Sequence, residues 1–170
     1  NQQSLKKAKK AYPYVRVTTD FSELIKDPEV DAVAIATPVF THYELAKKAL
    51  QEGKSVFVEK PFTYTVAEGK ELVELAEKKN LKIMVDHTFL YTGAVKRIKE
   101  LIEDHVLGNL YYFDSIRVNL GLFQHDVNVV WDLAPHDISI MDYLIGEKAQ
   151  AVTASGAEHF GRGLEDIAYL

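Results

Sequence analysis

The 170-residue sequence contains no cysteine. That absence excludes disulfide bridges, thiolate nucleophiles and zinc sites built on cysteine ligands, and it agrees with a reducing cytoplasm. The sequence also lacks any apolar run near the ~18 residues that a membrane-spanning helix needs, and no signal peptide opens it. We therefore expect a cytoplasmic protein without a membrane partner.

An excess of basic residues is missing as well, because 20 lysines and arginines stand against 25 aspartates and glutamates, for a net charge of −5. This charge argues against a general nucleic-acid-binding protein. With 47% hydrophobic and 26% charged residues, the composition is typical of a soluble globular protein. The length fits one domain or parts of two.

An unbroken apolar run at residues 32–36 and two further segments with apolar centres, 55–59 and 82–86, alternate with helical patterns at 41–52 and 65–79. Runs of this kind are typical of strands that are buried on both faces of a sheet. Strands that alternate with helices over short connections predict βαβ units, and therefore a parallel sheet with right-handed crossovers.

Capping boxes, in which a threonine or aspartate is followed three residues later by a glutamate, predict helix starts at Asp20, Thr41 and Thr65. Before the first of them we expect a helix over residues 2–11 and a short strand over 15–17. Polar residues follow each of the three buried strands: Thr37-Pro38, Glu59-Lys60-Pro61 and Asp86-His87. Ligands of parallel α/β sheets bind beyond these carboxyl ends, so the strand ends predict a binding edge.

The pattern changes after Phe89, and we place a domain boundary near residue 88. Residues 93–104 have the apolar stripe of an amphipathic helix. Alternation over residues 110–120 predicts a long, half-exposed strand, and a further strand is expected over 150–156.

A helix is predicted to begin at Asp132 as its N-cap and to end at Gly146, with Pro135 tolerated in the first turn. Asp132 and His136 are four residues apart, so their side chains share one face. A carboxylate beside an imidazole is a pair that general acid–base chemistry uses near neutral pH. One turn into the helix, the positive end of the dipole would oppose a charge on the ring, and Asp132 would favour it. The alternative is a capped helix whose histidine only packs.

Three landmarks occur in order: a strand ending in Thr37-Pro38 with His42 shortly after it, a strand ending in Glu59-Lys60-Pro61, and Asp132-x-x-x-His136 at a helix start. In this order they resemble the Gfo/Idh/MocA family, the glucose–fructose oxidoreductase and inositol dehydrogenase group, over essentially the whole chain. The resemblance implies an α/β fold, with a partial Rossmann-type parallel sheet followed by the start of an α/β domain with an open, mostly antiparallel sheet. Residues 1–88 would be the C-terminal part of a dinucleotide-binding domain, and residues 89–170 the N-terminal part of a substrate-binding, catalytic domain.

The resemblance also implies an oxidoreductase that transfers a hydride between NAD or NADP and a hydroxyl-bearing carbon of a sugar, cyclitol or nucleotide-linked sugar. The catalytic group would be Lys60, Asp132 and His136. The residues at the cofactor would be Thr37, Pro38, His42, Glu59 and Lys60. From their positions after the last Rossmann strand and in or just before the catalytic helix, we expect the substrate-binding residues to be His87, Tyr91, Asn119, Gln124 and His136. As in relatives, we expect a cis Lys60–Pro61 bond and a homo-oligomer formed through the sheet of the second domain.

The predicted roles follow from what the oxidation of a hydroxyl group requires. His136 would take the O–H proton, and Asp132 would orient its ring and stabilise the imidazolium. Lys60 would hydrogen-bond the reacting oxygen and favour the alkoxide. The cofactor carries the redox chemistry, and the protein supplies orientation and proton transfer.

The glycine-rich motif G-x-G-x-x-G is absent from all 170 residues. In a Rossmann fold that loop binds the pyrophosphate of the dinucleotide. We therefore expect a fragment that lacks the glycine-rich βαβ opening and much of the C-terminal domain.

Two other classes of protein stay open. One is a metal enzyme that uses His87, His125 and His136 with a nearby aspartate, Asp126 or Asp137, although their spacing matches no compact ligand motif, and we predict no metal. The other is a binding module that kept dinucleotide and sugar binding without turnover.

Overall fold

A computed structural model describes residues 2–118 and 126–170 of the chain. The chain divides into two compact units, Asn1–Val85 and Asp86–Leu170, which we call the first and the second unit. Among the described residues, no helix is both long and apolar enough to cross a membrane.

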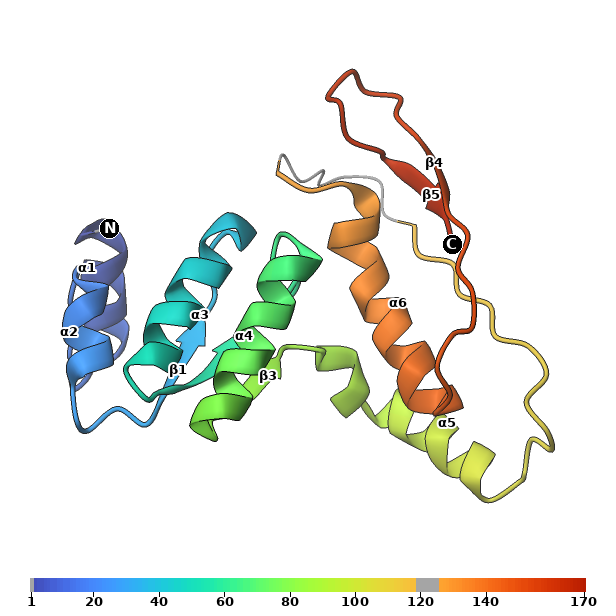
Figure 1. Cartoon of the computed structure of the whole chain (residues 1–170), viewed down its shortest axis with the longest axis horizontal. Helices are drawn as coiled ribbons and strands as arrows, with labels where there is room; N and C mark the ends of the chain where they lie inside the picture. Colours follow the sequence, from blue (N-terminus) through green and yellow to red (C-terminus); the bar gives the residue numbers. More distant parts are fainter. Residues whose placement is uncertain (1, 119–125) are drawn as a thin grey trace. The chain divides into compact units, whose positions relative to one another are not determined.

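The first unit contains a parallel sheet of three strands, β1 (Ala32–Ile35), β2 (Ser55–Val58) and β3 (Ile83–Val85), in the order β1-β2-β3. In the register, Ala32 lies opposite Ser55. Helix α3 (His42–Gln51) connects β1 to β2, and α4 (Val66–Lys79) connects β2 to β3; both are shown in Figure 1. The predicted βαβ units and parallel sheet are confirmed.

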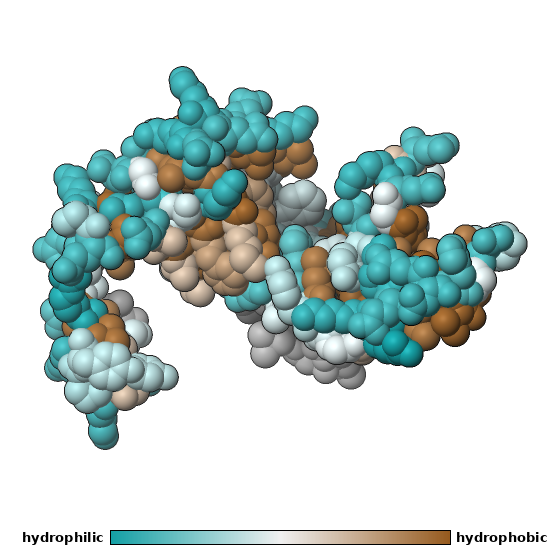
Figure 2. Space-filling view, turned by 90° about the horizontal axis from the view of Figure 1, so that it is seen from below, coloured by the Kyte–Doolittle hydropathy of each residue, from teal (hydrophilic) through white to brown (hydrophobic). Residues whose placement is uncertain are grey.

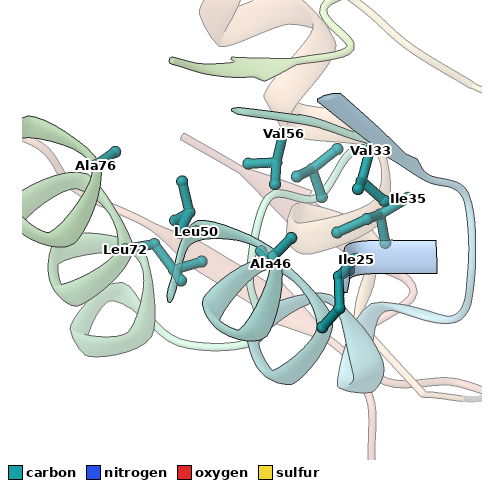
Figure 3. Close-up of a cluster of buried hydrophobic side chains, with 10 residues drawn as sticks. Ile25, Val33, Ile35, Ala46, Leu50, Val56, Leu72 and Ala76 are labelled. Atoms are coloured by element: carbon teal, nitrogen blue, oxygen red, sulfur yellow. The ribbon is translucent and has the colours of Figure 1, made fainter. Parts of the chain in front are cut away.

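The core of the first unit lies between the sheet and its helices. Figure 3 shows Ala46 and Leu50 of α3 and Leu72 of α4 on the side of the sheet to which Val33 and Val56 point. Leu50 and Leu72 are fully buried. Ile25 of α2 (Phe21–Lys26) and Ala76 of α4 belong to the same cluster.

The prediction that the strands are buried on both faces is wrong for this chain. Burial alternates along β1 and β2, so that every second residue is buried and its neighbours are partly or fully exposed. Met84, in the middle of β3, is also exposed. The reason is that α2, α3 and α4 all contribute to one cluster on one face.

Local capping was predicted in part. Thr65 and Glu68 form the predicted capping box of α4, and the Asp20 carboxylate accepts the N–H of Ser22 at the start of α2. The capping box predicted at Thr41 is wrong, because its side chain makes no cap hydrogen bond to α3. The Thr41 hydroxyl donates instead to the carbonyl of Pro38, at 2.8 Å.

The second unit has helices η2 (Thr88–Tyr91), α5 (Gly93–Glu103) and α6 (Val129–Ile145), with α6 packed against both η2 and α5. Strands β4 (Ser155–Ala157) and β5 (Ile167–Tyr169) pair antiparallel. The predicted antiparallel pairing is confirmed, although β4 is shorter than the strand expected over residues 150–156.

Helix α6 begins earlier than predicted, because its N-cap is Asn128 and not Asp132. The Asn128 side chain accepts the N–H of Trp131 at 3.0 Å, so Asp132 and Pro135 lie inside the helix. The end is as predicted, since Gly146 adopts the left-handed conformation and donates its N–H to the carbonyl of Asp142.

Two predicted strands are not found in the part of the chain that the structure describes. Within it, residues 15–17 and 110–118 have no strand pairing, while α1 (Gln2–Ala11) forms as predicted before the first of them. Figure 2 shows apolar side chains open on the surface, and Tyr111 and Val118 are among the most exposed. The alternation of residues 110–118 marks a segment that could pair, but a strand also needs a neighbour to pair with.

Candidate functional site

The carboxyl edge of the first unit's sheet is built around His42, the first residue of α3 and only 1% exposed. Its Nε2 lies 2.7 Å from the carbonyl oxygen of Thr37, and its Nδ1 lies 3.0 Å from the carbonyl oxygen of Pro61. Thr37 follows β1 and Pro61 follows β2, so one buried ring joins the segments that leave two neighbouring strands.

The contacts of the His42 ring indicate a structural role beside the predicted role at the cofactor. Both ring nitrogens face main-chain carbonyls, and the ring is buried. A neutral imidazole donates from one nitrogen only, and its tautomer decides which of the two carbonyls receives that hydrogen bond. The side chain is therefore placed to hold the strand ends.

The segment after β1 is further ordered by hydroxyl groups. The Thr37 and Thr41 hydroxyl oxygens lie 2.6 Å apart. The Thr41 hydroxyl and N–H both donate to the carbonyl of Pro38, which precedes the short helix η1 (Val39–Thr41). Thr37 and Pro38 thus lie in a tight turn.

The segment after β2 carries Glu59, Lys60 and Pro61. The Glu59 N–H donates to the carbonyl of Ile35 at 2.9 Å, which continues the pairing of β1 and β2 by one step. The Lys60 N–H donates to the Glu59 carboxylate at 3.2 Å. The Lys60–Pro61 peptide bond is cis, as predicted.

The second unit holds the predicted acid–base pair on α6. Asp132 and His136 are one turn apart on the same face, in the interior of the helix. The ring of Phe89, from η2, meets the His136 ring edge to face, with 4.8 Å between centroids. The helix dipole acts most strongly in the first turn of a helix. His136 is the eighth residue of α6 and lies beyond that turn.

A second charged group lies beside His136. Arg117 donates from Nε to Asp137 Oδ2 at 2.6 Å and from Nη2 to Oδ1 at 3.3 Å, and the Ser115 hydroxyl donates to Oδ1 at 2.7 Å. Burial, the largest single influence, raises the pKa of Asp137, but the hydrogen bonds from Arg117 and Ser115 and the charge of Arg117 act together against it, and the pKa is lowered. The positive charge of His136 lowers it further.

The predicted substrate residues lie in different surroundings. His87, before η2, is half-buried, and burial lowers its pKa while the charge of Asp86 opposes this change. Its Nδ1 is shielded from solvent and has no hydrogen-bond partner among residues 2–118 and 126–170. Tyr91 is exposed, with Lys96 Nζ 5.9 Å from its ring centroid. Asn119 and Gln124 lie outside the described residues.

Each unit thus brings together part of the predicted set. The first holds Thr37, Pro38, His42, Glu59 and Lys60 at neighbouring strand ends, and the second holds Asp132 and His136. In the described part of the chain, no three histidine, aspartate or glutamate side chains gather as a metal site would need. His125, which the metal alternative required, lies outside that part.

Sequence reasoning missed the contribution of Phe89 and Arg117. The guanidinium of Arg117 lies 4.8 Å from the Phe89 ring centroid. Arg117 belongs to an irregular segment and is 20 residues from its partner Asp137, so no periodicity could pair them. The only local indication was that Asp137, a residue able to form an ion pair, directly follows His136 in the sequence.

Comparison with known proteins identifies the family. Residues 1–87 match the GFO_IDH_MocA family, described as an oxidoreductase family with an NAD-binding Rossmann fold. An uncharacterised oxidoreductase of Schizosaccharomyces pombe is 37% identical over 162 residues, which are 90% of this chain and 41% of that protein. The scyllo-inositol 2-dehydrogenase (NAD(+)) of Bacillus subtilis is 30% identical over 139 residues, covering 79% of this chain and 41% of the enzyme.

Solved structures agree with this result. The structure of an oxidoreductase-like protein of Bacteroides fragilis superposes with a TM-score of 0.81 at 33% identity, and the match covers 95% of this chain and 47% of that one. The chain spans about two fifths of the length of these curated relatives. The predicted family, Rossmann fold and NAD(P) cofactor are confirmed. The chain belongs to the Gfo/Idh/MocA family of oxidoreductases with an NAD-binding Rossmann fold.

Proposed function

We propose that the full-length protein is an NAD(P)-dependent dehydrogenase that acts on a hydroxyl-bearing carbon of a sugar, cyclitol or nucleotide-linked sugar. The observation that carries the proposal is the pair on α6, where His136 follows Asp132 by one helical turn and packs against Phe89. The 30% identity to a scyllo-inositol 2-dehydrogenase supports a polyhydroxylated ring as the substrate.

The strand ends of the first unit fit the cofactor that the family implies. Ligands of parallel α/β sheets lie beyond the carboxyl ends of the strands, and this edge carries Thr37, Pro38, Glu59 and Lys60. We assign these four residues to the cofactor, with His42 holding their two segments in place. When bound, NAD(P) supplies the hydride acceptor or donor.

The chain's own residues perform the proton chemistry. His136 takes the proton of the substrate hydroxyl as general base. Asp132 orients the imidazole and stabilises its cationic form. Lys60 donates a hydrogen bond to the reacting oxygen and favours its negative charge.

Substrate binding is assigned to His87 and Tyr91, together with His136. Because burial lowers the pKa of His87, its ring is neutral near pH 7 and offers both a donor and an acceptor. Neutral groups of this kind suit hydroxyl groups of a sugar. Tyr91 adds an exposed aromatic face and a hydroxyl. Asn119 and Gln124 stay candidates from the sequence.

A homo-oligomer through the sheet of the second unit is part of the proposal. Ile167 and Tyr169 of β5 and Val152 before β4 are exposed apolar side chains, and such groups are enriched in subunit interfaces. Light scattering on the full-length protein gives its mass in solution. A monomeric protein would contradict this assignment without affecting the dehydrogenase assignment.

The experiment is a panel of sugars, cyclitols and sugar nucleotides offered to the full-length protein with NAD⁺ or NADP⁺, followed by absorbance of the reduced cofactor. His136→Ala should lower kcat by ~10²–10⁴, with little change in dinucleotide affinity. His105→Asn, which replaces an exposed histidine of the same unit, is the control. Dinucleotide and sugar binding without any reduction would instead favour the binding module.

A further inference from the structure

Phe89 is in contact with two functional groups of the second unit. One is the His136 ring, at 4.8 Å edge to face, and the other is the Arg117 guanidinium, 4.8 Å from the ring centroid. Arg117 in turn forms the two-point ion pair with Asp137, the residue that follows His136. A continuous set of contacts therefore leads from the ion pair to the imidazole.

We propose that Phe89, Arg117 and Asp137 are positioning residues for His136, which fix the orientation of its ring and balance the charge beside it. The inference deepens the proposed function, because it rests on His136 being the general base. The Phe89 ring packs against the His136 ring and limits its rotation. The ion pair keeps the Arg117 guanidinium in place beside Phe89.

The ion pair is built more firmly than an ordinary surface pair. Its side chains are 29% and 23% exposed, the guanidinium engages both carboxylate oxygens, and Ser115 donates to the same carboxylate. Two-point geometry of this kind gives orientation as well as energy. By contrast, Lys148 and Asp142, also at α6, form a single contact in which the lysine side chain is 87% exposed.

The pair also controls the charge that His136 meets. An aspartate beside an imidazole favours the imidazolium form, which would hold back the neutral base. Arg117, which is paired with the carboxylate, opposes that effect with its positive charge. If Asp137 loses its charge, the remaining positive charge of Arg117 should disfavour the imidazolium form of His136. If Arg117 loses its charge, the remaining negative charge of Asp137 should favour that form.

Other charged or titratable groups on α6 and on the elements packed against it also influence the titration of His136. They are Asp132 on α6 itself, Asp86 and His87 before η2, Lys99 on α5 and Glu165 before β5. Lys99 reaches the carbonyl of Leu144 and Glu165 accepts the N–H of Val129, so these two act at the ends of the helix.

The test is the pH dependence of kcat/KM in the full-length protein, measured for Asp137→Asn, Arg117→Gln and the double variant. Asp137→Asn keeps the shape of the side chain and leaves the charge of Arg117 unbalanced, so the midpoint should move to lower pH by about half a unit to one unit. Arg117→Gln should move it to higher pH by a similar amount. The double variant should return close to the wild-type midpoint.

Two more variants separate orientation from charge. Arg117→Lys keeps the positive charge but loses the two-point geometry, so kcat should fall while the midpoint stays. Phe89→Leu should also lower kcat, by up to ~10², without moving the midpoint. Asp142→Asn, which removes the exposed pair with Lys148, is the matched control and should change neither quantity.

An NMR titration of the His136 ring in each variant gives the same midpoints without turnover, so a poorly active variant still reports on the proposal. Midpoints that stay at the wild-type value in both single variants, with His136→Ala still inactive, would overturn the positioning role and leave the proposed function intact. A fully active His136→Ala variant would overturn the proposed function itself.

Discussion

Replacing His42 by alanine should be among the most damaging single changes in the first unit. The imidazole is 1% exposed and lies within hydrogen-bond distance of the carbonyl oxygens of Thr37 and Pro61. Removing the ring takes away the hydrogen bond that it donates and its contact with the second carbonyl oxygen, and it empties a volume inside the fold. The change therefore combines two costly effects at a single position.

The magnitude follows from the two contacts. A buried acceptor that loses its donor costs ~1–3 kcal/mol, and the emptied volume adds to this loss, for a total of about 2–5 kcal/mol. Against the ~5–15 kcal/mol by which ordinary domains are stable, such a loss is large.

Urea unfolding followed by circular dichroism measures this loss as a lower midpoint at an unchanged slope. His105→Asn is the control, because His105 is exposed and has φ 55°, a conformation that asparagine tolerates. The control should stay within ~0.5 kcal/mol of the wild type. If His42→Ala also stays within that range, the ring does not hold the strand ends. In the full-length protein, the same variant should weaken NAD⁺ binding, measured by calorimetry.

Three further predictions concern other described side chains. Leu72→Ala, at a fully buried position of α4, should lower the free energy of unfolding by ~2–5 kcal/mol, while Val73→Ala on the exposed side of that helix should cost less than half as much in the same urea experiment. Thr65→Ala removes the capping side chain of α4 and should cost ~0.5–2 kcal/mol, with Thr65→Ser restoring most of it. Because the folded-state pKa of Asp137 is lowered, its stabilising contribution is complete above the unfolded-state pKa of ~3.9 and is lost as the pH falls through the folded-state value. The acid side of the melting-temperature profile should therefore flatten in Asp137→Asn, and an unchanged profile would show that the pair with Arg117 adds no stability.

Much of the first unit could be predicted because its signals are local. Three apolar runs between turn residues identified β1, β2 and β3, and the Thr65 capping box identified the start of α4. The position of the strand ends followed, and with it the placing of Thr37 and Lys60 at one edge. What failed there was burial on both faces, because burial depends on how many layers the fold has and no single strand encodes that number.

The second unit was harder to predict because its decisive contacts are distant in sequence. Residues 110–118 alternate as a strand would, but a strand forms only with a partner. The ion pair of Arg117 and Asp137 joins an irregular segment to a helix across 20 residues, and no spacing rule connects them. Phe89 was visible only as a marker of the domain boundary, since its two contacts come from elements that the sequence does not place together.

The start of α6 shows how one distant contact changes the chemistry inferred from a motif. Asn128 and Asp132 are both good N-cap residues, and local rules do not choose between them. Glu165 favours Asn128 as the N-cap. Its carbonyl accepts the N–H of Val129, and its carboxylate accepts a side-chain N–H of Asn128. The helix therefore begins one turn earlier, and His136 lies beyond the reach of the dipole at the helix end. The charge around this base is consequently set by side chains, with Asp132 on its own face and the Arg117–Asp137 pair beside it, and side chains can be changed one at a time.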